Sequence, residues 1–165
     1  METEELVESA LNGNVEDFTK LVEKHQNLAL GYAFSRIGNF SQAQDIVQES
    51  LIIAHSKLKN LEKPEAFSSW LRGIVHFRCN RYFRMNKKEF LPLEDYCETP
   101  SDNFSLEKKL QKEQERSHLL KAVKSLPENL RTVITLFYLE EKSQKEVALF
   151  LGISSSKVNN YLHQA

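Results

Sequence analysis

The stretch that decides the fold is SQKEVALFLGISSSKVNNYLH, residues 143–163. Ala148 lies four residues before Gly152, and Val158 lies six residues after it. A small side chain lets two helices approach, the glycine permits a tight turn, and the apolar residue re-enters the shared core. This spacing predicts a helix-turn-helix.

The second helix of this motif has a polar outward face. Its side chains carry hydroxyl, amide or cationic groups, which suit contacts with phosphates and base edges in a major groove. Ser143 and Glu146 predict a capping box at the start of the first helix. A plain helical hairpin with a solvated polar face is the alternative to DNA binding. The candidate DNA-contact residues are Ser155, Ser156, Lys157, Asn159, Asn160 and His163.

Most of the chain before this motif repeats apolar residues at intervals of three and four, which is typical of amphipathic helices. Ser41 with Gln44 predicts a capping box for a helix that carries residues 43–54. Pro64 suits the first turn of the next helix, where its missing N–H costs nothing. No alternating run is long enough for a strand, so the sequence predicts an all-α fold.

The helical pattern breaks in the middle of the chain. Residues 89–107 carry six acids and no base. A helical rhythm resumes over residues 106–123, and the sequence SLPE at 125–128 predicts another capped helix start. We therefore expect two small helical domains, residues 1–88 and 106–165, joined by an acidic linker at residues 89–105.

Basic and aromatic side chains alternate in WLRGIVHFRCNRYFRMNKK, residues 70–88, where the last 17 positions carry six bases and no acid. Arginines attract phosphates, and exposed rings can stack on bases taken out of a duplex. The segment therefore suits single-stranded or locally melted DNA. Trp70 shares helical spacing with apolar neighbours and is expected in the core, whereas Phe77 and Phe83 fit either role.

The remaining features exclude several classes of function. The 165 residues are 41% hydrophobic and 27% charged with a net charge of −1, as in a globular protein. The sequence has no membrane-spanning run, no signal peptide, and two cysteines (Cys79 and Cys97) that make no disulfide framework, so we expect a cytoplasmic protein without membrane insertion. His76 and Cys79 have no further ligand at metal-site spacing, so no metal is predicted. Without a phosphate loop or nucleophile motif, neither catalysis nor a cofactor is predicted.

Two segments of the chain resemble a known family. AQDIVQESLIIA (43–54), followed by WLRGIVHFRCNRYFR (70–84), is similar to conserved region two of bacterial sigma factors, and residues 126–165 resemble region four. The short acidic linker in place of a third domain resembles the extracytoplasmic-function (ECF) subfamily. The resemblance implies a non-enzymatic factor that binds core RNA polymerase and directs it to promoter DNA. It also implies control by an anti-sigma protein, which in this family is often membrane-bound.

The resemblance assigns roles to individual residues. The candidate polymerase-binding residues are Asp45, Gln48, Glu49 and Ile52. The candidate contacts to the minus-ten region are Arg72, His76, Phe77, Arg78, Asn80, Arg81, Tyr82 and Arg84. Arg131 joins the recognition-helix residues named above as candidate contacts to the minus-thirty-five region. Phe77 and Arg81 stand where the family often has asparagine and aspartate, so inherited base specificity is not expected there.

Two other functions fit the same residues. A sigma-like decoy would bind an anti-sigma protein without initiating transcription, and the departures at Phe77 and Arg81 and the end of the sequence at Ala165 favour it. An ordinary repressor or activator would use the helix-turn-helix alone, but residues 1–71, with 11 acids and 6 bases, argue against it. A pull-down with core polymerase separates these hypotheses from a sigma factor.

Overall fold

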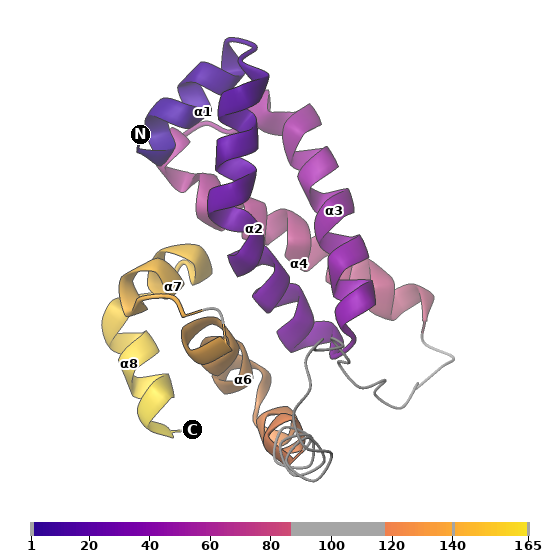
Figure 1. Ribbon diagram of the computed structural model, residues 1–165. Coiled ribbons are helices and arrows are strands. Elements are labelled where there is room, and N and C mark those ends of the chain that lie inside the picture. The colour runs from indigo at the N-terminus through magenta and orange to yellow at the C-terminus, as the bar shows by residue number, and fades with distance from the viewer. Residues whose placement is uncertain (1, 87–117, 140, 165) are drawn as a thin grey trace, which may run out of the picture.

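The computed structural model describes residues 2–86, 118–139 and 141–164, and all regular structure in these ranges is helical. Figure 1 shows an N-terminal bundle, α1 to α4, with α6 to α8 packed against one side of it. The all-α prediction is confirmed. The predicted linker at 89–105, residues 106–117, Lys87, Lys88 and Cys97 lie outside the described residues.

Asparagine side chains begin two of the three long helices of the bundle, α2 and α3. The Oδ1 atom of Asn14 accepts hydrogen bonds from the backbone N–H groups of residues 16 and 17, at 3.1 and 3.3 Å. Asn39 accepts from the N–H of Gln42 at 3.0 Å, so the capping box predicted at Ser41 and Gln44 is wrong. Gly38, with φ 75°, ends the preceding helix. The first three helices of the chain are α1 (Thr3–Leu11), α2 (Val15–Ile37) and α3 (Phe40–Lys57).

The fourth helix crosses beneath the others and supplies much of the core. Pro64 takes the first position of a short 3-10 turn that leads directly into this helix, close to its predicted place. Phe67, Leu71, Val75 and Cys79 are buried at four-residue intervals. Trp70 packs against this core, as predicted, with its ring 6.0 Å from that of Phe67. The elements are η1 (Leu58–Asn60), η2 (Pro64–Ala66) and α4 (Phe67–Met85).

The helix that begins at Glu128 starts differently from the prediction. Pro127 occupies the N-cap position of α6, and no side chain caps that helix. The Ser125 hydroxyl instead donates to the Ala122 carbonyl at 2.7 Å and closes the preceding helical segment, residues 118–125. The capping signature predicted at residues 125–128 is therefore wrong. The elements are α6 (Glu128–Ile134), the π-helical turn η3 (Thr135–Leu139), α7 (Gln144–Leu151) and α8 (Ser155–Gln164).

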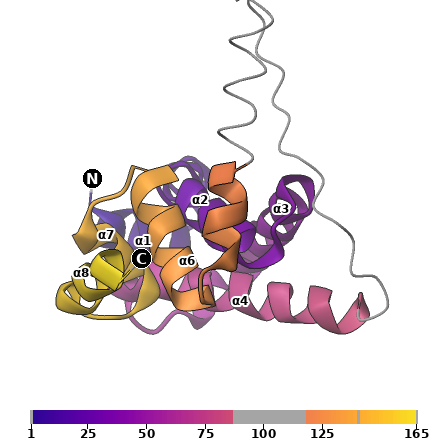
Figure 2. The same cartoon turned by 90° about the horizontal axis from the view of Figure 1, so that it is seen from below.

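The two halves of the chain share one hydrophobic core. Buried side chains of α2 and α4 are contiguous with those of the C-terminal helices, and the rings of Tyr32 and Phe150 meet edge to face at 5.9 Å. A buried hydrogen bond of 3.0 Å joins the hydroxyls of Ser35 and Thr132. Figure 2 shows the C-terminal half of α4 extending past α6, α7 and α8. The C-terminal helices therefore cover the first half of α4 and do not extend over its second half.

None of the described helices is both long enough and apolar enough to cross a lipid bilayer.

Candidate nucleic-acid interface

One face of α4 presents a ring and two cations to solvent. The Phe77 side chain is 59% exposed, and Arg81 and Arg84 are also exposed. The guanidinium of Arg84 lies over the Phe77 ring, 6.0 Å from its centroid. Of the two roles left open for Phe77, the structure excludes the core role. This face meets the requirements for a strand-binding surface, since its cations can attract phosphates and its ring can stack on a base.

The neighbouring face of α4 carries two further candidate DNA residues in a polar network. The Tyr32 hydroxyl is 2.8 Å from His76 Nδ1, and His76 Nε2 is 2.9 Å from Asn80 Nδ2. Arg36 Nη2 donates to Asn80 Oδ1 at 3.0 Å, and the same guanidinium forms an ion pair with Glu128 of α6. Burial, reinforced by nearby arginines, lowers the pKa of His76. These contacts hold His76 and Asn80 away from any DNA in the packed arrangement.

The other arginines of α4 are partly covered. Arg72 is half-buried beside the turn at Gly152 in the C-terminal module, and within the described residues its Nε has no hydrogen-bond partner. Arg78 forms an ion pair with Glu49, a predicted polymerase-binding residue on α3. The Tyr82 hydroxyl donates to the side chain of Gln42. Of the eight candidate minus-ten residues, the structure therefore leaves Phe77, Arg81 and Arg84 open to solvent.

A groove between α3 and α4 brings the two predicted surfaces together. It is lined by candidate residues of both sets, so a partner on α3 and a strand on α4 would lie side by side. The exposed face of α3 also carries Gln48 and Ile52, whose side chain is 70% exposed although it is apolar. The groove is lined by Gln42, Asp45, Ile46, Glu49, Arg78, Arg81, Tyr82, Met85 and Asn86.

The helix-turn-helix forms as the sequence predicts. The Ser143 hydroxyl accepts from the Glu146 N–H at 3.3 Å, while a Glu146 carboxylate oxygen accepts from the Ser143 N–H at 3.0 Å. The Ser143 hydroxyl also donates to the Glu146 carboxylate at 2.7 Å, and this hydrogen bond, together with the one from the Ser143 N–H, lowers the pKa of Glu146. Gly152 adopts the left-handed conformation at φ 66°, and Val158 is completely buried. The predicted helix-turn-helix is therefore confirmed, with its capping box, its glycine turn and its buried Val158.

The outward face of α8 is open, except at one position. Asn159 is half-buried and accepts from Gln144 Nε2 of α7 at 3.4 Å. Arg131, predicted to contact the same DNA, is half-buried and donates to the Lys124 carbonyl at 3.1 Å. The Lys157 ammonium lies 5.8 Å from the centroid of the Tyr161 ring. The exposed candidates on α8 are Ser155, Ser156, Lys157, Asn160 and His163.

Sequence reasoning missed the contact between the modules. Arg36 and Glu128 are 92 residues apart, and Ser35 and Thr132 are 97 apart. The single signal was the pair Ser35 and Arg36, two polar residues within an otherwise apolar helix end. No local pattern indicated its partner.

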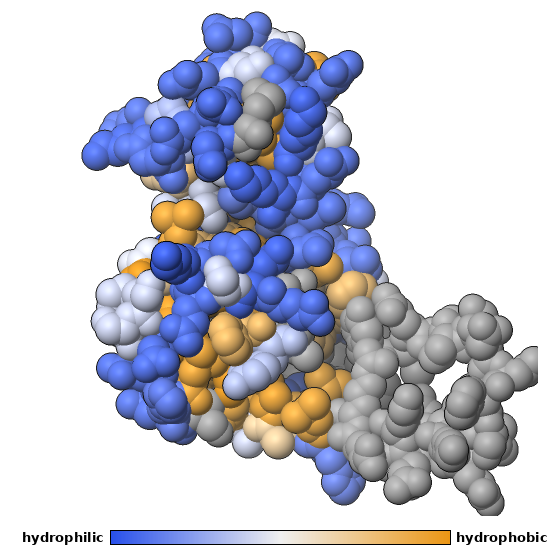
Figure 3. All heavy atoms as spheres, turned by 60° about the vertical axis from the view of Figure 1, so that its left-hand side comes forward, coloured by the Kyte–Doolittle hydropathy of each residue, from blue (hydrophilic) through white to orange (hydrophobic). Residues whose placement is uncertain are grey.

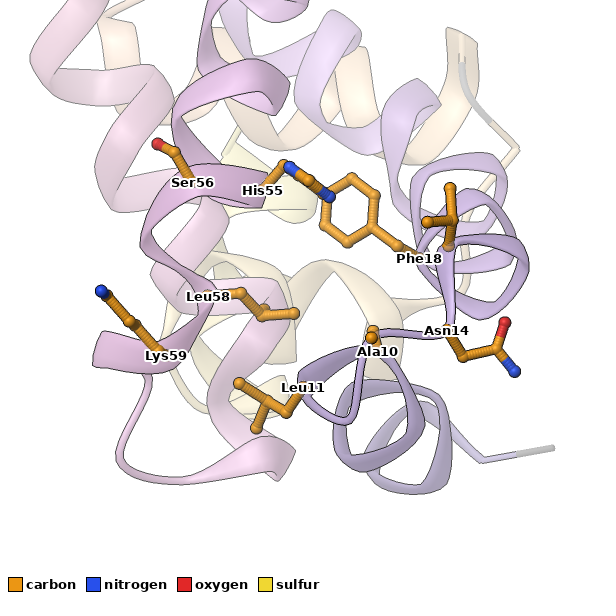
Figure 4. A pocket seen from close by; sticks show the side chains of 10 residues that line it. Ala10, Leu11, Asn14, Phe18, His55, Ser56, Leu58 and Lys59 are labelled. Carbon is orange, nitrogen blue, oxygen red and sulfur yellow. The ribbon is translucent and has the colours of Figure 1, made fainter.

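A pocket lies at the far end of the bundle from α6 and α8, between the turn that joins α1 to α2 and the end of α3 (Figure 1, Figure 4). In Figure 4 the rings of Phe18 and His55 lie next to each other at its upper edge, in an edge-to-face contact with centroids 4.7 Å apart and an interplanar angle of 73°. The pocket is separate from both predicted DNA surfaces.

Comparisons with known proteins match both modules to one family. The family model "Sigma-70 region 2" matches residues 21–89, and "Sigma-70, region 4" matches residues 117–165. The RNA polymerase sigma-E factor of Streptomyces coelicolor is 27% identical over 93% of this chain and 84% of its own. The ECF RNA polymerase sigma-E factor of Haemophilus influenzae is 27% identical, with coverage of 97% and 89%. The RNA polymerase sigma factor YlaC of Bacillus subtilis is 28% identical, with coverage of 88% and 85%.

A solved structure, CnrH in complex with the cytosolic domain of CnrY, has the same fold. It superposes with a TM-score of 0.63 and 24% identity, covering 99% of this chain and 91% of the other. The chain belongs to the sigma-70 family of sigma factors, the DNA-binding proteins that direct transcription initiation at promoters. Within that family it is an ECF-type sigma factor, as the sequence resemblance implied.

Proposed function

We propose that this sigma factor binds core RNA polymerase through the exposed face of α3 and contacts promoter DNA through α4 and α8. It acts in the cytoplasm, without catalysing a reaction of its own and without a cofactor. The observation that carries the proposal is the groove between α3 and α4, which places the acidic candidates for polymerase beside the basic candidates for DNA. A factor that holds a strand against polymerase needs these two surfaces to be adjacent.

The polymerase-binding surface consists of Asp45, Gln48, Glu49 and Ile52. Both acids are exposed, and the exposed Ile52 provides apolar area at the same place. Charge complementarity to a basic partner would speed association and fix its orientation. Because Glu49 also pairs with Arg78, docking on α3 can alter the position of an arginine on the DNA-binding helix.

The minus-ten candidates fall into three groups, one of which, Arg78 and Tyr82, contacts α3. Phe77, Arg81 and Arg84 can meet a strand directly, whereas Arg72, His76 and Asn80 must first exchange their contacts with α2 or with the C-terminal module. Full engagement of α4 therefore requires α6 and α7 to move away from it. The domain boundaries expected from the sequence, residues 1–88 and 106–165, allow this if the intervening segment acts as a linker.

The minus-thirty-five surface is the outward face of α8. Ser155, Ser156, Asn160 and His163 offer hydrogen-bonding groups, and Lys157 adds one cation. Asn159 and Arg131 can join them only after releasing their contacts with Gln144 and Lys124. With a single free cation on α8 itself, this contact should have a shallow salt dependence.

We also propose that an anti-sigma protein controls the factor. Support comes from the family resemblance and from the structural neighbour, which was solved with a domain of a second protein. Exposed apolar side chains in the C-terminal module, Leu119, Tyr138 and Leu149, give a protein partner area to cover. Figure 3 shows apolar surface gathered in the lower part of the molecule, where the C-terminal helices lie.

Run-off transcription with core polymerase tests the proposal. Wild-type protein should join the core and initiate from at least one genomic promoter. Asp45→Ala with Glu49→Ala should reduce core affinity at least about tenfold, while Glu4→Ala with Glu8→Ala, two exposed acids on α1, should not change it. Wild-type protein that binds an anti-sigma protein but neither joins the core nor initiates would instead identify the decoy.

A further inference from the structure

His25 lies on the side of α2 that the C-terminal module covers. Tyr32 follows it by seven residues and Arg36 follows by four more, so the three side chains share one face of the helix. The Tyr32 ring meets the Phe150 ring of α7 edge to face. Arg36 forms an ion pair with Glu128 of α6. His25 therefore belongs to the contact between the two modules.

The His25 ring is buried at this contact without a hydrogen bond. The residue is 5% exposed, and neither ring nitrogen has a partner within the part of the chain that the structure describes. The Phe67 ring of α4 packs against it, with 5.2 Å between the ring centroids. A leucine could fill comparable space and leave no polar atom unsatisfied, so packing alone does not account for an imidazole here.

Charges from both modules act on this ring. Of the described charged groups, Lys24 of α2 and the pair Lys142 and Glu146 near the start of α7 are the ones that do so. Their balance is positive, since two lysines face one carboxylate. Glu146 accepts from Ser143 and makes no hydrogen bond to the ring. A proton on His25 would therefore create a buried cation that lacks an acceptor and faces more positive than negative charge.

We propose that His25 is an acid-sensitive switch between the two modules. Neutral His25 permits the packed arrangement, whereas protonated His25 drives the C-terminal module away from α2 and α4. Separation exposes the imidazole to water, which solvates the cation that the packed contact cannot solvate. It also uncovers the first half of α4, including Arg72. The switch does not depend on the proposed function, although any effect of acid on promoter binding does.

The size of the effect follows from the pKa of His25 in the two arrangements. Burial lowers this pKa from 6.5 to about 4 in the packed form, and exposure to water should restore the ordinary value in the separated form. The separated form therefore binds the proton more tightly, and a fall in pH favours it. Between pH 7.5 and pH 5.5 the equilibrium constant for separation should rise about tenfold.

Single-molecule energy transfer in the full chain measures this equilibrium. Dyes at Glu16→Cys and His163→Cys, exposed positions on α2 and α8, report the distance between the modules in a Cys97→Ser background. Glu128→Arg is added to weaken the contact, so that the separated form can be counted. The ratio of low-transfer to high-transfer molecules should rise about tenfold from pH 7.5 to pH 5.5. Dyes at Glu16→Cys and Ser41→Cys, both within the bundle, should show no change, which distinguishes separation from unfolding.

Two histidine variants test whether His25 is the group responsible. His25→Leu should abolish the rise, because leucine fills the space without binding a proton. His76 also lies near this contact, but both of its ring nitrogens are within hydrogen-bond distance of partners, Tyr32 and Asn80. His76→Gln is therefore the matched control and should keep the tenfold rise.

Three results would overturn the switch. One is a separated population that is missing at pH 5.5 or equal at the two pH values. Another is an undiminished rise in His25→Leu or its loss in His76→Gln, which would place the titrating group elsewhere. The third is a parallel change in the dye pair within the bundle, which would show unfolding. Because polymerase and DNA are absent from the measurement, a failure of the proposed function would leave each of these results unchanged.

Discussion

Ser35 of α2 and Thr132 of α6 share a buried hydrogen bond, with their hydroxyl oxygens 3.0 Å apart. It joins the region that resembles sigma region 2 to the region that resembles region 4. Neither residue belongs to a surface that the sequence assigned to polymerase or DNA. The pair is therefore a probe of the packed arrangement itself, and changing it should leave both functional surfaces intact.

Thr132→Val should lower the free energy of unfolding by about 1 kcal/mol, because it removes one partner from a buried hydrogen bond. The loss is limited, since the Ser35 hydroxyl also donates to the Tyr32 carbonyl at 2.8 Å. Urea denaturation of both single variants and of Ser35→Ala with Thr132→Val measures the coupling. Strictly additive effects would show that the two hydroxyls do not interact in solution.

Glu128→Arg should loosen the contact between the modules. The Arg36 side chain is 10% exposed and Glu128 is 54% exposed, so the change places two cations together where one is largely buried. We expect a larger radius of gyration in small-angle scattering and faster hydrogen exchange in α6. Glu62→Arg, a change at an exposed acid between η1 and η2, is the control. A radius equal to that of wild type would show that this ion pair does not hold the modules together.

Protonation of His25 should lower the free energy of unfolding at acidic pH. Its side chain is buried beside Phe67, neither ring nitrogen has a hydrogen-bond partner among the residues that the structure describes, and burial lowers its pKa from 6.5 to about 4. The unfolded chain therefore binds the proton more tightly than the folded chain does. The stability that neutral His25 confers is complete above pH 6.5 and is lost as the pH falls toward 4, a total of about 3 kcal/mol.

Urea denaturation from pH 7 to pH 4 measures this effect. His25→Leu should flatten the slope across that window, while His118→Gln, a change at an exposed histidine, should leave it as in wild type. Lys142 and Glu146, near the start of α7, both act on the His25 ring electrostatically. An unaltered pH slope in His25→Leu would mean that the ring is solvated in solution.

Cys79 should be unreactive while the protein is folded. It is completely buried, and burial raises the pKa of its thiol from 9.0 to about 11. At pH 8 this lowers the thiolate fraction about 100-fold, and exclusion of the reagent slows the reaction further. Alkylation of a Cys97→Ser variant with iodoacetamide, followed by mass spectrometry, measures the rate at Cys79. It should be slow without urea and rapid with it; rapid modification of the folded protein would contradict the burial.

The local features that the sequence predicted are those made by residues close together in the chain. The capping box of Ser143 and Glu146, the left-handed Gly152 and the buried Val158 all depend on contacts within a few residues, and all are present. Two other predicted caps failed for a local reason as well. Asn39 is a better N-cap than Ser41 where it stands, and Pro127 leaves α6 without a side-chain cap.

The accessibility of the candidate site could not be predicted in the same way. The spacing of Arg72, His76, Phe77 and Arg84 placed them on one basic helix, but spacing does not show which side of that helix another module covers. The structure partly buries Arg72 beside the turn at Gly152 and His76 against Tyr32, and it leaves Phe77 and Arg84 open to solvent.

The sequence by itself determined the helices and the helix-turn-helix of the C-terminal module, and it indicated the family. It could do so because helix propensity, capping and apolar periodicity each depend on residues a few positions apart. Tertiary structure alone decided that the two modules share a core and that the C-terminal module covers the first half of α4. Those outcomes depend on side chains more than ninety positions apart, such as Arg36 and Glu128, and only the packing of whole helices brings such residues together.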